Sequence, residues 1–270
     1  MGEHSIIPAA TLLLVRDAVT GLEVFMLKRN HAIDFVPGAM VFPGGKVDPA
    51  DSDPTLADAC RSAESLPREA LCLRIAAIRE SFEECGILLA RARGSEQLVD
   101  EARARAVDAK HRDALCHGDT DLATIVAEEE LELAGDLPVY FAHWITPDVM
   151  PRRFDTHFFL VETPAGQSAV HDGGESVDSV WITPREAIAE EAADRLNIIF
   201  PTLMQLEKLS RYESVADAIA ATRAEPVVTV LPRIESGENG PTLHIPIEAG
   251  YGMSEAPVEA FFKKLPGKPA

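Results

Sequence analysis

The amino-acid sequence predicts an α/β fold in which helices cover both faces of a mixed sheet. Short apolar runs typical of strands alternate with helical runs along the chain, without an internal repeat or a long linker. Such interleaving is typical of layered α/β architectures. A chain of 270 residues is also long enough to bury a full core as one large domain.

Strands and helices in the first half are distinguished by their hydrophobic period. Strand-like runs are short, apolar and bounded by turn residues, whereas the main helix has apolar residues at steps of three and four. A Pro-Gly-Gly turn ends the third strand. The predicted elements are strands at 9–16 and 22–28 joined by a turn at 17–21, a strand at 39–42, an Asp- and Ala-rich insertion at 51–66, a helix at 69–92 and a mostly helical segment at 95–134.

The second half continues the alternation. Thr183 and Pro184 predict a helix start, because threonine caps helix N-termini and proline fits the first turn. The predicted elements are paired strands at 139–145 and 153–161, a strand at 179–182, a helix after Thr183, a helical region at 201–223 in two pieces, and two strand-like runs at 227–247 around a Gly-rich turn at 237–240.

Three carboxylates on the helix at 69–92 form the main candidate site. At 100° per residue, Glu80, Glu83 and Glu84 fall within one third of the helix circumference. Like charges at this spacing repel by roughly 0.2–0.5 kcal/mol per pair, and a hard cation such as Mg²⁺ would turn that cost into coordination. Arg79 stands four residues before Glu83 and can fix its rotamer. The opposite stripe is apolar: Leu71, Ile75, Ile78, Phe82 and Cys85.

An ordinary solvated acidic face is the alternative interpretation of this helix, and the upstream segment argues against it. Residues 41–48 are a short apolar run stopped by Pro43-Gly44-Gly45, which predicts a strand that ends in a tight turn. The glycine pair exposes backbone carbonyls without side chains in the way. A strand, a glycine turn and a carboxylate helix together predict a pocket for a metal-bound diphosphate.

These residues resemble the Nudix hydrolase superfamily, whose signature runs from a glycine to Arg-Glu-U-x-Glu-Glu-x-Gly-U, where U is apolar. The matching residues are Gly45, Arg79, Glu80, Glu83, Glu84, Gly86 and Ile87. The resemblance implies a Nudix-type α/β/α sandwich with helical insertions and a C-terminal extension. It also implies Mg²⁺ or Mn²⁺ held by Glu83 and Glu84, with Glu80 as a further ligand or base, the Gly44 carbonyl as a backbone ligand and Arg79 orienting Glu83.

Two departures from the signature narrow the resemblance. Gly45 precedes Arg79 by 34 positions instead of the usual 14, so about twenty residues are inserted near 49–67. Leu71 occupies the place of a glutamate, and Asp48 is a candidate substitute for its structural role. Residues 35–48, beginning at Phe35, and residues 151–160 resemble the subgroup with an interrupted signature that contains the mammalian peroxisomal coenzyme A diphosphatases.

The implied activity is hydrolysis of a diphosphate that joins a nucleoside to another moiety, with coenzyme A or acyl-coenzyme A as candidate substrates. ADP-ribose, NADH and dinucleoside polyphosphates are alternatives within the enzyme class. A non-catalytic Nudix-fold nucleotide sensor and a scaffold protein whose insertions bind a partner are alternatives outside it. A sensor could lose the carboxylates freely, and their presence favours the enzyme.

Weaker candidates lie outside the signature. Glu175 follows a Gly-Gly turn six residues before Trp181 and is a candidate metal ligand or base, with Asp178 as a lesser rival. The candidate substrate-binding residues are Arg29, Gly45 and Arg153. Arg152 and Arg153 alternate in a strand, so at most one of them faces substrate. His157 is interpreted as a core or surface histidine.

Composition limits the partners. The net charge of −19 argues against nucleic acid and anionic membrane surfaces, and no stretch is apolar enough to span a bilayer. Four cysteines without metal-ligand spacing favour reduced thiols and a cytoplasmic location. The expected organisation is a Nudix domain at 5–210, with insertions at about 49–67 and 95–134, and a C-terminal extension at 211–270 packed on it. The insertions are candidate lids or surfaces of a homodimer.

Overall fold

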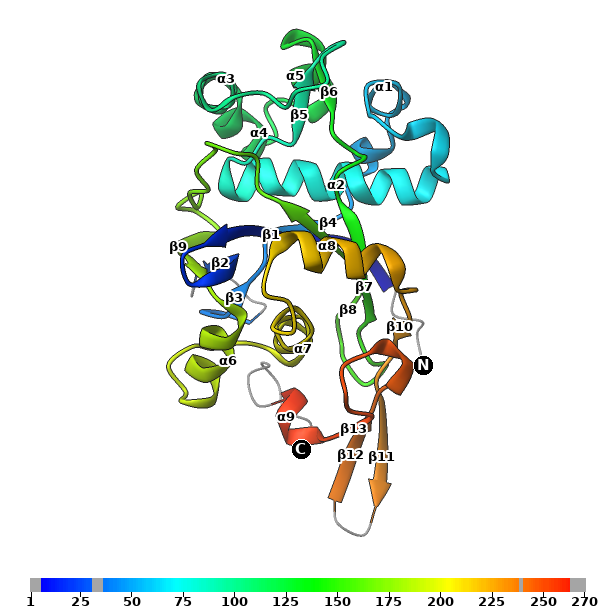
Figure 1. The fold of residues 1–270 in the computed structure, drawn as a ribbon. Coiled ribbons are helices and arrows are strands. Elements are labelled where there is room, and N and C mark those ends of the chain that lie inside the picture. Colours follow the sequence, from blue (N-terminus) through cyan, green and yellow to red (C-terminus); the bar gives the residue numbers. More distant parts are fainter. Residues whose placement is uncertain (1–5, 31–35, 238–239, 263–270) are drawn as a thin grey trace.

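A mixed sheet of eight strands lies at the centre of the computed structural model, which describes residues 6–30, 36–237 and 240–262 (Figure 1). The strand order is β10-β7-β8-β1-β2-β3, while β4 pairs with β1 and β9 with β2. This arrangement confirms the predicted α/β fold. The strands are β1 (Ile6–Ala18), β2 (Gly21–Arg29), β3 (Met40–Val41), β4 (Gly44–Lys46), β7 (Val139–Ile145), β8 (Arg153–Glu162), β9 (Ser176–Ile182) and β10 (Thr229–Val230).

The long strand β1 organises the sheet because it has different neighbours along its length. It pairs in parallel with β8 from Ile6 to Val15. On its other edge, residues 9–11 pair with β4 and residues 15–18 form the predicted hairpin with β2. The sheet therefore forks, and the glycine turn lies at the fork.

Helix α2 (Arg68–Cys85) covers one face of the sheet (Figure 1). The predicted apolar stripe is buried in full against strand residues such as Leu12 and Phe159. The prediction that the helix continues to residue 92 is wrong. Gly86 ends it in the left-handed conformation (φ 71°), donating its N–H to the Phe82 carbonyl, and the chain then forms β5 (Ala90–Ala92).

The two insertions pack on the side of α2 that faces away from the sheet (Figure 1). The region at 95–134 is mostly helical as predicted, but its last residues form a strand that pairs with β5. The insertion elements are the 3₁₀ turn η1 (Pro49–Ser52), α1 (Pro54–Asp58), the 3₁₀ turn η2 (Ala63–Ser65), α3 (Glu101–Val107), the π-helical turn η3 (Asp108–Arg112), α4 (Asp113–Cys116), α5 (Leu122–Glu128) and β6 (Leu131–Leu133).

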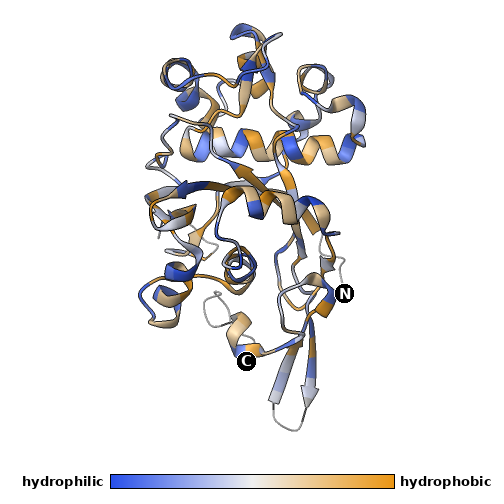
Figure 2. Cartoon of the chain, viewed as in Figure 1, coloured by the Kyte–Doolittle hydropathy of each residue, from blue (hydrophilic) through white to orange (hydrophobic). Residues whose placement is uncertain are grey.

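A second core fills the opposite face of the sheet, beneath α6 (Pro184–Ala192), α7 (Phe200–Leu209) and α8 (Val215–Ala224). The start of α6 is as predicted, with the Thr183 side chain accepting from the Glu186 N–H in a capping box. The two pieces expected at 201–223 are α7 and α8. Hydrophobic residues concentrate on the central strands and the helix sides that face them (Figure 2).

The C-terminal part begins with β10, which pairs in parallel with β7. The two strand-like runs predicted at 227–247 correspond to the antiparallel pair β11 (Arg233–Gly237) and β12 (Gly240–His244). The 3₁₀ turn η4 (Ile247–Ala249), β13 (Glu255–Pro257) and α9 (Val258–Phe262) follow. The Trp144 indole donates to the Tyr251 hydroxyl at 2.8 Å, which joins this part to β7. The boundary at residue 210 stays a prediction, and Phe35, residue 5 and residues 263–270 lie outside the described residues.

Within the described ranges, every helix is too short or too polar to cross a membrane.

Candidate functional site

Arg79 on α2 is the hub of the site. Its Nη1 donates to Glu80 at 2.9 Å and to both oxygens of Glu83 at 3.1 and 3.2 Å. Its Nη2 donates to the Lys46 carbonyl at 2.9 Å, which ties the helix to β4. The expectation that Arg79 fixes Glu83 therefore agrees with the geometry, and the same guanidinium also holds Glu80 and the glycine turn.

Asp51 on η1 completes this hub and is the residue that sequence reasoning missed. Its carboxylate accepts two hydrogen bonds from Arg79, at 2.7 and 3.0 Å, and the aspartate is only 1% exposed. Asp48, the expected substitute, instead caps η1 by accepting from the Ala50 N–H. The Asp48-Pro49-x-Asp51 pattern forms a capping box. This pattern could have indicated Asp51 from the sequence, because a capping box fixes the second aspartate in a turn.

The glycine turn holds Glu84 and lies against Glu80. Glu84 accepts a hydrogen bond from the Gly44 N–H at 2.8 Å. A side chain at Gly44 would approach the Ala10 carbonyl oxygen to 2.5 Å, and one at Gly45 would approach Glu80 Oε1 to 2.5 Å. Glycine at both positions thus lets the strand and the carboxylates meet at contact distance. The prediction that the Gly44 carbonyl is a ligand stays untested, since the observed contact is made by its N–H.

Arg112, from the π-helical turn of the insertion, closes the end of α2. It donates to the Glu83 carbonyl at 2.9 Å and to the Val170 carbonyl at 3.0 Å. A cation at a helix C-terminus satisfies otherwise unpaired carbonyls and interacts favourably with the helix dipole. The insertion therefore forms one wall of the site, which its composition alone did not indicate.

Arg79, Arg112, the glycine turn and the signature glutamates line one large polar cleft of about 1400 Å³. The predicted candidates that it brings together are Arg29, Gly44, Gly45, Arg79, Glu80, Glu83, Glu84 and Glu175. Glu175 lies on the loop before β9, beside the end of β2, where Asn30 N–H donates to its carbonyl at 2.8 Å. Its negative charge contributes to raising the pKa of Glu83 and Glu84.

Arg153 and Asp178 lie elsewhere. Arg153 Nε donates to the Thr146 carbonyl at 2.9 Å, while its neighbour Arg152 lines the cleft. The assignment of Arg153 to substrate is therefore corrected, because alternation along β8 gives the cleft to residues 154 and 156 and leaves Arg153 on the other side. Asp178 pairs with Lys28 in the β2–β9 register and accepts from the Ser179 N–H.

Burial raises the pKa of all three signature carboxyls. The pKa of Glu80 rises to about 7, with Arg79 opposing the shift. Burial also raises the pKa of Glu83, and it raises the pKa of the buried Glu84 well above its usual value, with Glu80 adding to the effect. Three carboxyls that resist ionisation are a functional-site signal, because a nearby cation would reverse the cost.

The donor set fits a hard divalent cation. The side chains that converge on the glycine turn offer carboxylate oxygens, the ligands preferred by Mg²⁺. Glu83 and Glu84 are each held by a protein donor, Arg79 and the Gly44 N–H respectively. A cation would therefore have to share or displace these contacts.

A smaller apolar cavity of about 180 Å³ adjoins the cleft. The two share Thr11, Arg29, Gly44, Phe154 and Thr156 in their walls. The rest of the small cavity is largely hydrophobic, including Val41, Phe42, Trp144, Met150 and Phe158. The site thus combines a polar region suited to phosphates with an apolar region beside it.

Comparisons with known proteins all identify relatives of the Nudix type. The family model described as the NUDT19 Nudix domain matches residues 52–209. The acyl-coenzyme A diphosphatase NUDT19 of Xenopus laevis is 26% identical over 232 residues, covering 72% of this chain and 61% of the relative. The putative nudix hydrolase 7 of Caenorhabditis elegans is 30% identical over 203 residues, covering 75% and 60%. The chain thus spans about three fifths of the length of these relatives.

A solved structure supports the same fold. The crystal structure of a NUDIX hydrolase from Alicyclobacillus acidocaldarius superposes with a TM-score of 0.65 and 25% sequence identity. The match covers 81% of this chain and 97% of that one. The expected α/β/α sandwich of the Nudix type is thereby confirmed.

Proposed function

This chain belongs to the Nudix family, in the group of the NUDT19 Nudix domain, and on that basis we propose that it hydrolyses the diphosphate bond of a nucleoside diphosphate linked to another moiety. The observation that carries the proposal is the group of Glu80, Glu83 and Glu84, which is partly to fully buried and is gathered at the glycine turn by Arg79 and the Gly44 N–H. Nudix hydrolases generally use divalent metal ions, and the ion proposed for this chain is Mg²⁺ or Mn²⁺.

Each side chain has a defined part in this proposal. Glu83 and Glu84 would hold the ion, with Glu80 as a further ligand, and Arg79 sets the rotamer of Glu83. When bound, a divalent ion neutralises the bridging phosphates and lowers the pKa of a bound water. Arg29 and Arg152, which line the same cleft, would pair with phosphate oxygens.

Proton removal from the attacking water requires a base in the cleft. Glu80 is one candidate base, because it lines the cleft beside the proposed metal ligands. Glu175, which lines the same cleft, is the alternative base. Glu80→Gln and Glu175→Gln, compared by kcat at saturating metal, assign the role to the residue whose loss lowers kcat by about 10²-fold or more.

The proposed substrates are coenzyme A and acyl-coenzyme A. The support is the similarity to the Xenopus laevis acyl-coenzyme A diphosphatase, together with the apolar cavity beside the cleft. That cavity would take an apolar portion of the substrate while the diphosphate lies at the carboxylates. ADP-ribose, NADH and dinucleoside polyphosphates carry a second polar moiety and are expected to be cleaved more slowly.

A substrate panel with product masses tests the proposal. Coenzyme A, acyl-coenzyme A, ADP-ribose, NADH and diadenosine polyphosphates are incubated with the protein and Mg²⁺ or Mn²⁺. We expect cleavage of the coenzyme A diphosphate, and a loss of at least about 10²-fold in kcat in Glu83→Gln and Glu84→Gln while both variants stay folded. Parental turnover in the double variant would show that the assigned site is wrong, and binding without cleavage of any compound would favour a sensor.

A further inference from the structure

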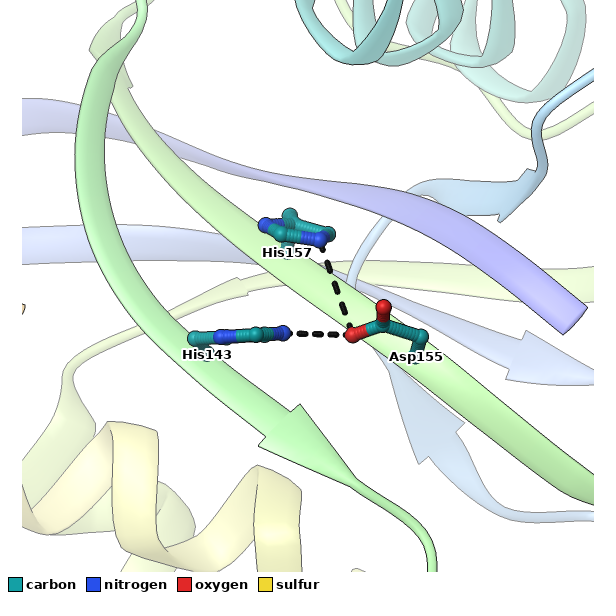
Figure 3. Close-up of side chains that lie close together, drawn as sticks. All are labelled: His143, Asp155 and His157. Carbon is teal, nitrogen blue, oxygen red and sulfur yellow. Dashed lines mark hydrogen bonds and ion pairs between the residues drawn. The ribbon is translucent and has the colours of Figure 1, made fainter. Parts of the chain in front are cut away.

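A second group of potential ligands lies on the sheet, outside the cleft. His143 on β7 and Asp155 and His157 on β8 each offer one ligand atom, and these atoms lie within 4.8 Å of one another (Figure 3). We propose that these three side chains form a binding site for a transition-metal ion of the Zn²⁺ class, separate from the site of the diphosphate reaction.

The strand register builds this group. His143 is the direct cross-strand partner of His157, and Asp155 lies two residues from His157 on the same strand. Residues at i and i+2 share a face, and a direct partner together with its diagonal neighbour lies within reach. Thr156 lies between the two β8 ligands in sequence and lines the cleft instead. The two sites therefore use opposite faces of β8.

Both imidazole rings are oriented by hydroxyl groups at their far nitrogens. His143 Nδ1 contacts Thr229 Oγ1 at 2.8 Å, and His157 Nδ1 contacts the Tyr140 hydroxyl at 2.7 Å. In the metal-bound tautomer each hydroxyl would accept a hydrogen bond from Nδ1–H, which leaves the Nε2 lone pair for the ion. Partners that fix the ring and tautomer of a ligating histidine are the usual outer contacts of a metal site.

A β-bulge supplies one of these contacts. The register of β7 against β8 shifts between Tyr140 and Ala142. Without the shift, the alternation of β7 would turn Tyr140 away from the face of His143 and His157. Bulges commonly re-aim a side chain, and here the bulge brings the Tyr140 hydroxyl to His157.

Asp155 Oδ1 is the point on which both rings converge. The His143 Nε2 atom makes a short hydrogen bond to this oxygen, and the His157 Nε2 atom lies 3.6 Å from it (Figure 3). The rings are stacked with centroids 4.1 Å apart. Two nitrogens that are each about 2.1 Å from a tetrahedral ion lie about 3.4 Å apart. The three ligand atoms observed here lie within 4.8 Å of one another, so small rotations of the rings would bring them to the spacing that an ion requires.

The chemistry of the donors selects the ion. Two imidazoles and one carboxylate suit Zn²⁺ and related first-row metals, whereas Mg²⁺ prefers oxygen ligands alone. The side chains keep between 15% and 35% exposure, which leaves a route for the ion and a water as fourth ligand.

Metal titration of the full chain tests the site. The protein is treated with a chelator, dialysed and titrated with Zn²⁺ or Co²⁺ in excess Mg²⁺, so that the carboxylate cleft is occupied. We expect one equivalent of tightly bound Zn²⁺, visible absorption typical of four-coordinate Co²⁺, and a rise in Tm of about 5–10 °C at a Zn²⁺ concentration of about 100 Kd.

Matched variants separate this site from other histidines and from the cleft. His143→Gln and His157→Gln should weaken Zn²⁺ binding by at least about tenfold, and Tyr140→Phe, which keeps all three ligands, should weaken it by about 10–100-fold. His244→Gln is the control, because His244 also lies near two carboxylates, at 3.8 and 3.6 Å, without a second histidine. It should bind Zn²⁺ as the parent does, and so should Glu83→Gln.

Equal Zn²⁺ affinity in the parent and in folded His143→Gln and His157→Gln would overturn the proposal, as would a parent that binds no Zn²⁺. Circular dichroism verifies folding of each variant. If a histidine variant unfolds, the Tyr140→Phe measurement decides: unchanged affinity in that variant counts against the site. Loss of Zn²⁺ binding in Glu83→Gln alone would assign the ion to the cleft instead.

Discussion

At the scale of single residues, the Arg79 guanidinium is the group on which the site geometry depends. It contacts two signature glutamates, the Lys46 carbonyl and Asp51. Arg79 is 9% exposed and Asp51 is 1% exposed, so neither charge has much water around it. Loss of Asp51 removes two of the hydrogen bonds that hold the buried guanidinium, and loss of Arg79 leaves Asp51 as a buried charge without its cationic partner.

Asp51→Ala is therefore expected to lower the free energy of unfolding by about 3–5 kcal/mol, the range for breaking a buried pair. The control is Glu213→Ala, which breaks an ion pair with Arg185 whose side chains are 75% and 67% exposed, respectively. That change should cost no more than about 1 kcal/mol. Urea denaturation of both variants gives the comparison, and equal small losses would refute the structural role of Asp51.

The raised pKa values predict how pH affects metal binding. Glu80 has a folded pKa of about 7 against an ordinary value of 4.5. A carboxyl whose pKa is raised favours the folded chain at low pH, and this contribution is lost as pH rises from about 4.5 through 7. A cation competes with the bound protons, so its stabilising effect grows over the same interval.

The rise in Tm produced by a fixed concentration of Mg²⁺ should accordingly be larger at pH 8 than at pH 5.5. Differential scanning calorimetry at both pH values measures it, and the difference should shrink in Glu80→Gln, which carries no titrating group at that position. A Mg²⁺ effect that is independent of pH, or larger at pH 5.5, would contradict the assignment of these carboxyls.

Sequence reasoning identified the signature residues because they occur in one helical turn with the right spacing. It missed Asp51 and Arg112, which reach the site from insertions 28 and 29 residues away from their contacts. It also chose Arg153 over Arg152, because periodicity shows that two neighbours face opposite sides without showing which side holds the cleft. The sequence therefore did not predict the contacts that join residues far apart in the chain.

At the scale of elements, the insertion between β5 and β6 is part of the site. The π-helical turn η3 carries Arg112 to the last turn of α2, where it donates to two carbonyls. A hydrogen bond from a charged donor typically contributes about 1.5–3 kcal/mol. The insertion therefore supports the end of the helix that carries the carboxylates.

Arg112→Ala is expected to lower the free energy of unfolding by about 1.5–3 kcal/mol and to speed amide exchange at the C-terminal turn of α2. Arg105→Ala is the control, since Arg105 lies on α3 and pairs with Glu101 at the exposed surface. Hydrogen exchange measured by mass spectrometry reports both changes. Unchanged protection of residues 80–85 in Arg112→Ala would show that the insertion does not support this helix end.

Hairpins and helix caps were predictable at this scale, because they follow from local turn residues such as Thr183 and Gly21. The end of α2 was not predicted correctly. Gly86 is a helix-stop residue, but apolar residues continue past it to residue 90 and suggested a longer helix. The strand at residues 131–133 also escaped prediction. Leu-Glu-Leu has no strong local preference, and the strand forms by pairing with β5, which lies about forty residues earlier.

At the scale of the whole molecule, the charge of the chain opposes its proposed substrate. The net charge is −19, whereas a diphosphate ester is an anion. A field of like sign slows association, and salt screens it, since the Debye length falls from about 30 Å at 0.01 M to about 8 Å at 0.15 M ionic strength. Arg29, Arg152 and the bound cation would act only locally.

The KM for coenzyme A should therefore fall as monovalent salt rises from about 0.01 to 0.15 M at constant saturating Mg²⁺. Initial rates at several salt concentrations measure this change, and a neutral viscogen series controls for diffusion. A KM that rises with salt would show that local positive charges in the cleft dominate over the net charge.

The central claim is that Glu80, Glu83 and Glu84 hold the divalent ion at which the diphosphate is cleaved. A crystal structure of the protein with Mn²⁺ and a non-hydrolysable diphosphate analogue tests it most directly, because Mn²⁺ is identified by anomalous scattering. The account predicts an ion about 2.0–2.3 Å from oxygens of Glu83 and Glu84 and bridged to the analogue. An analogue bound elsewhere, with Glu83 still on Arg79 and Glu84 still on the Gly44 N–H, would contradict it.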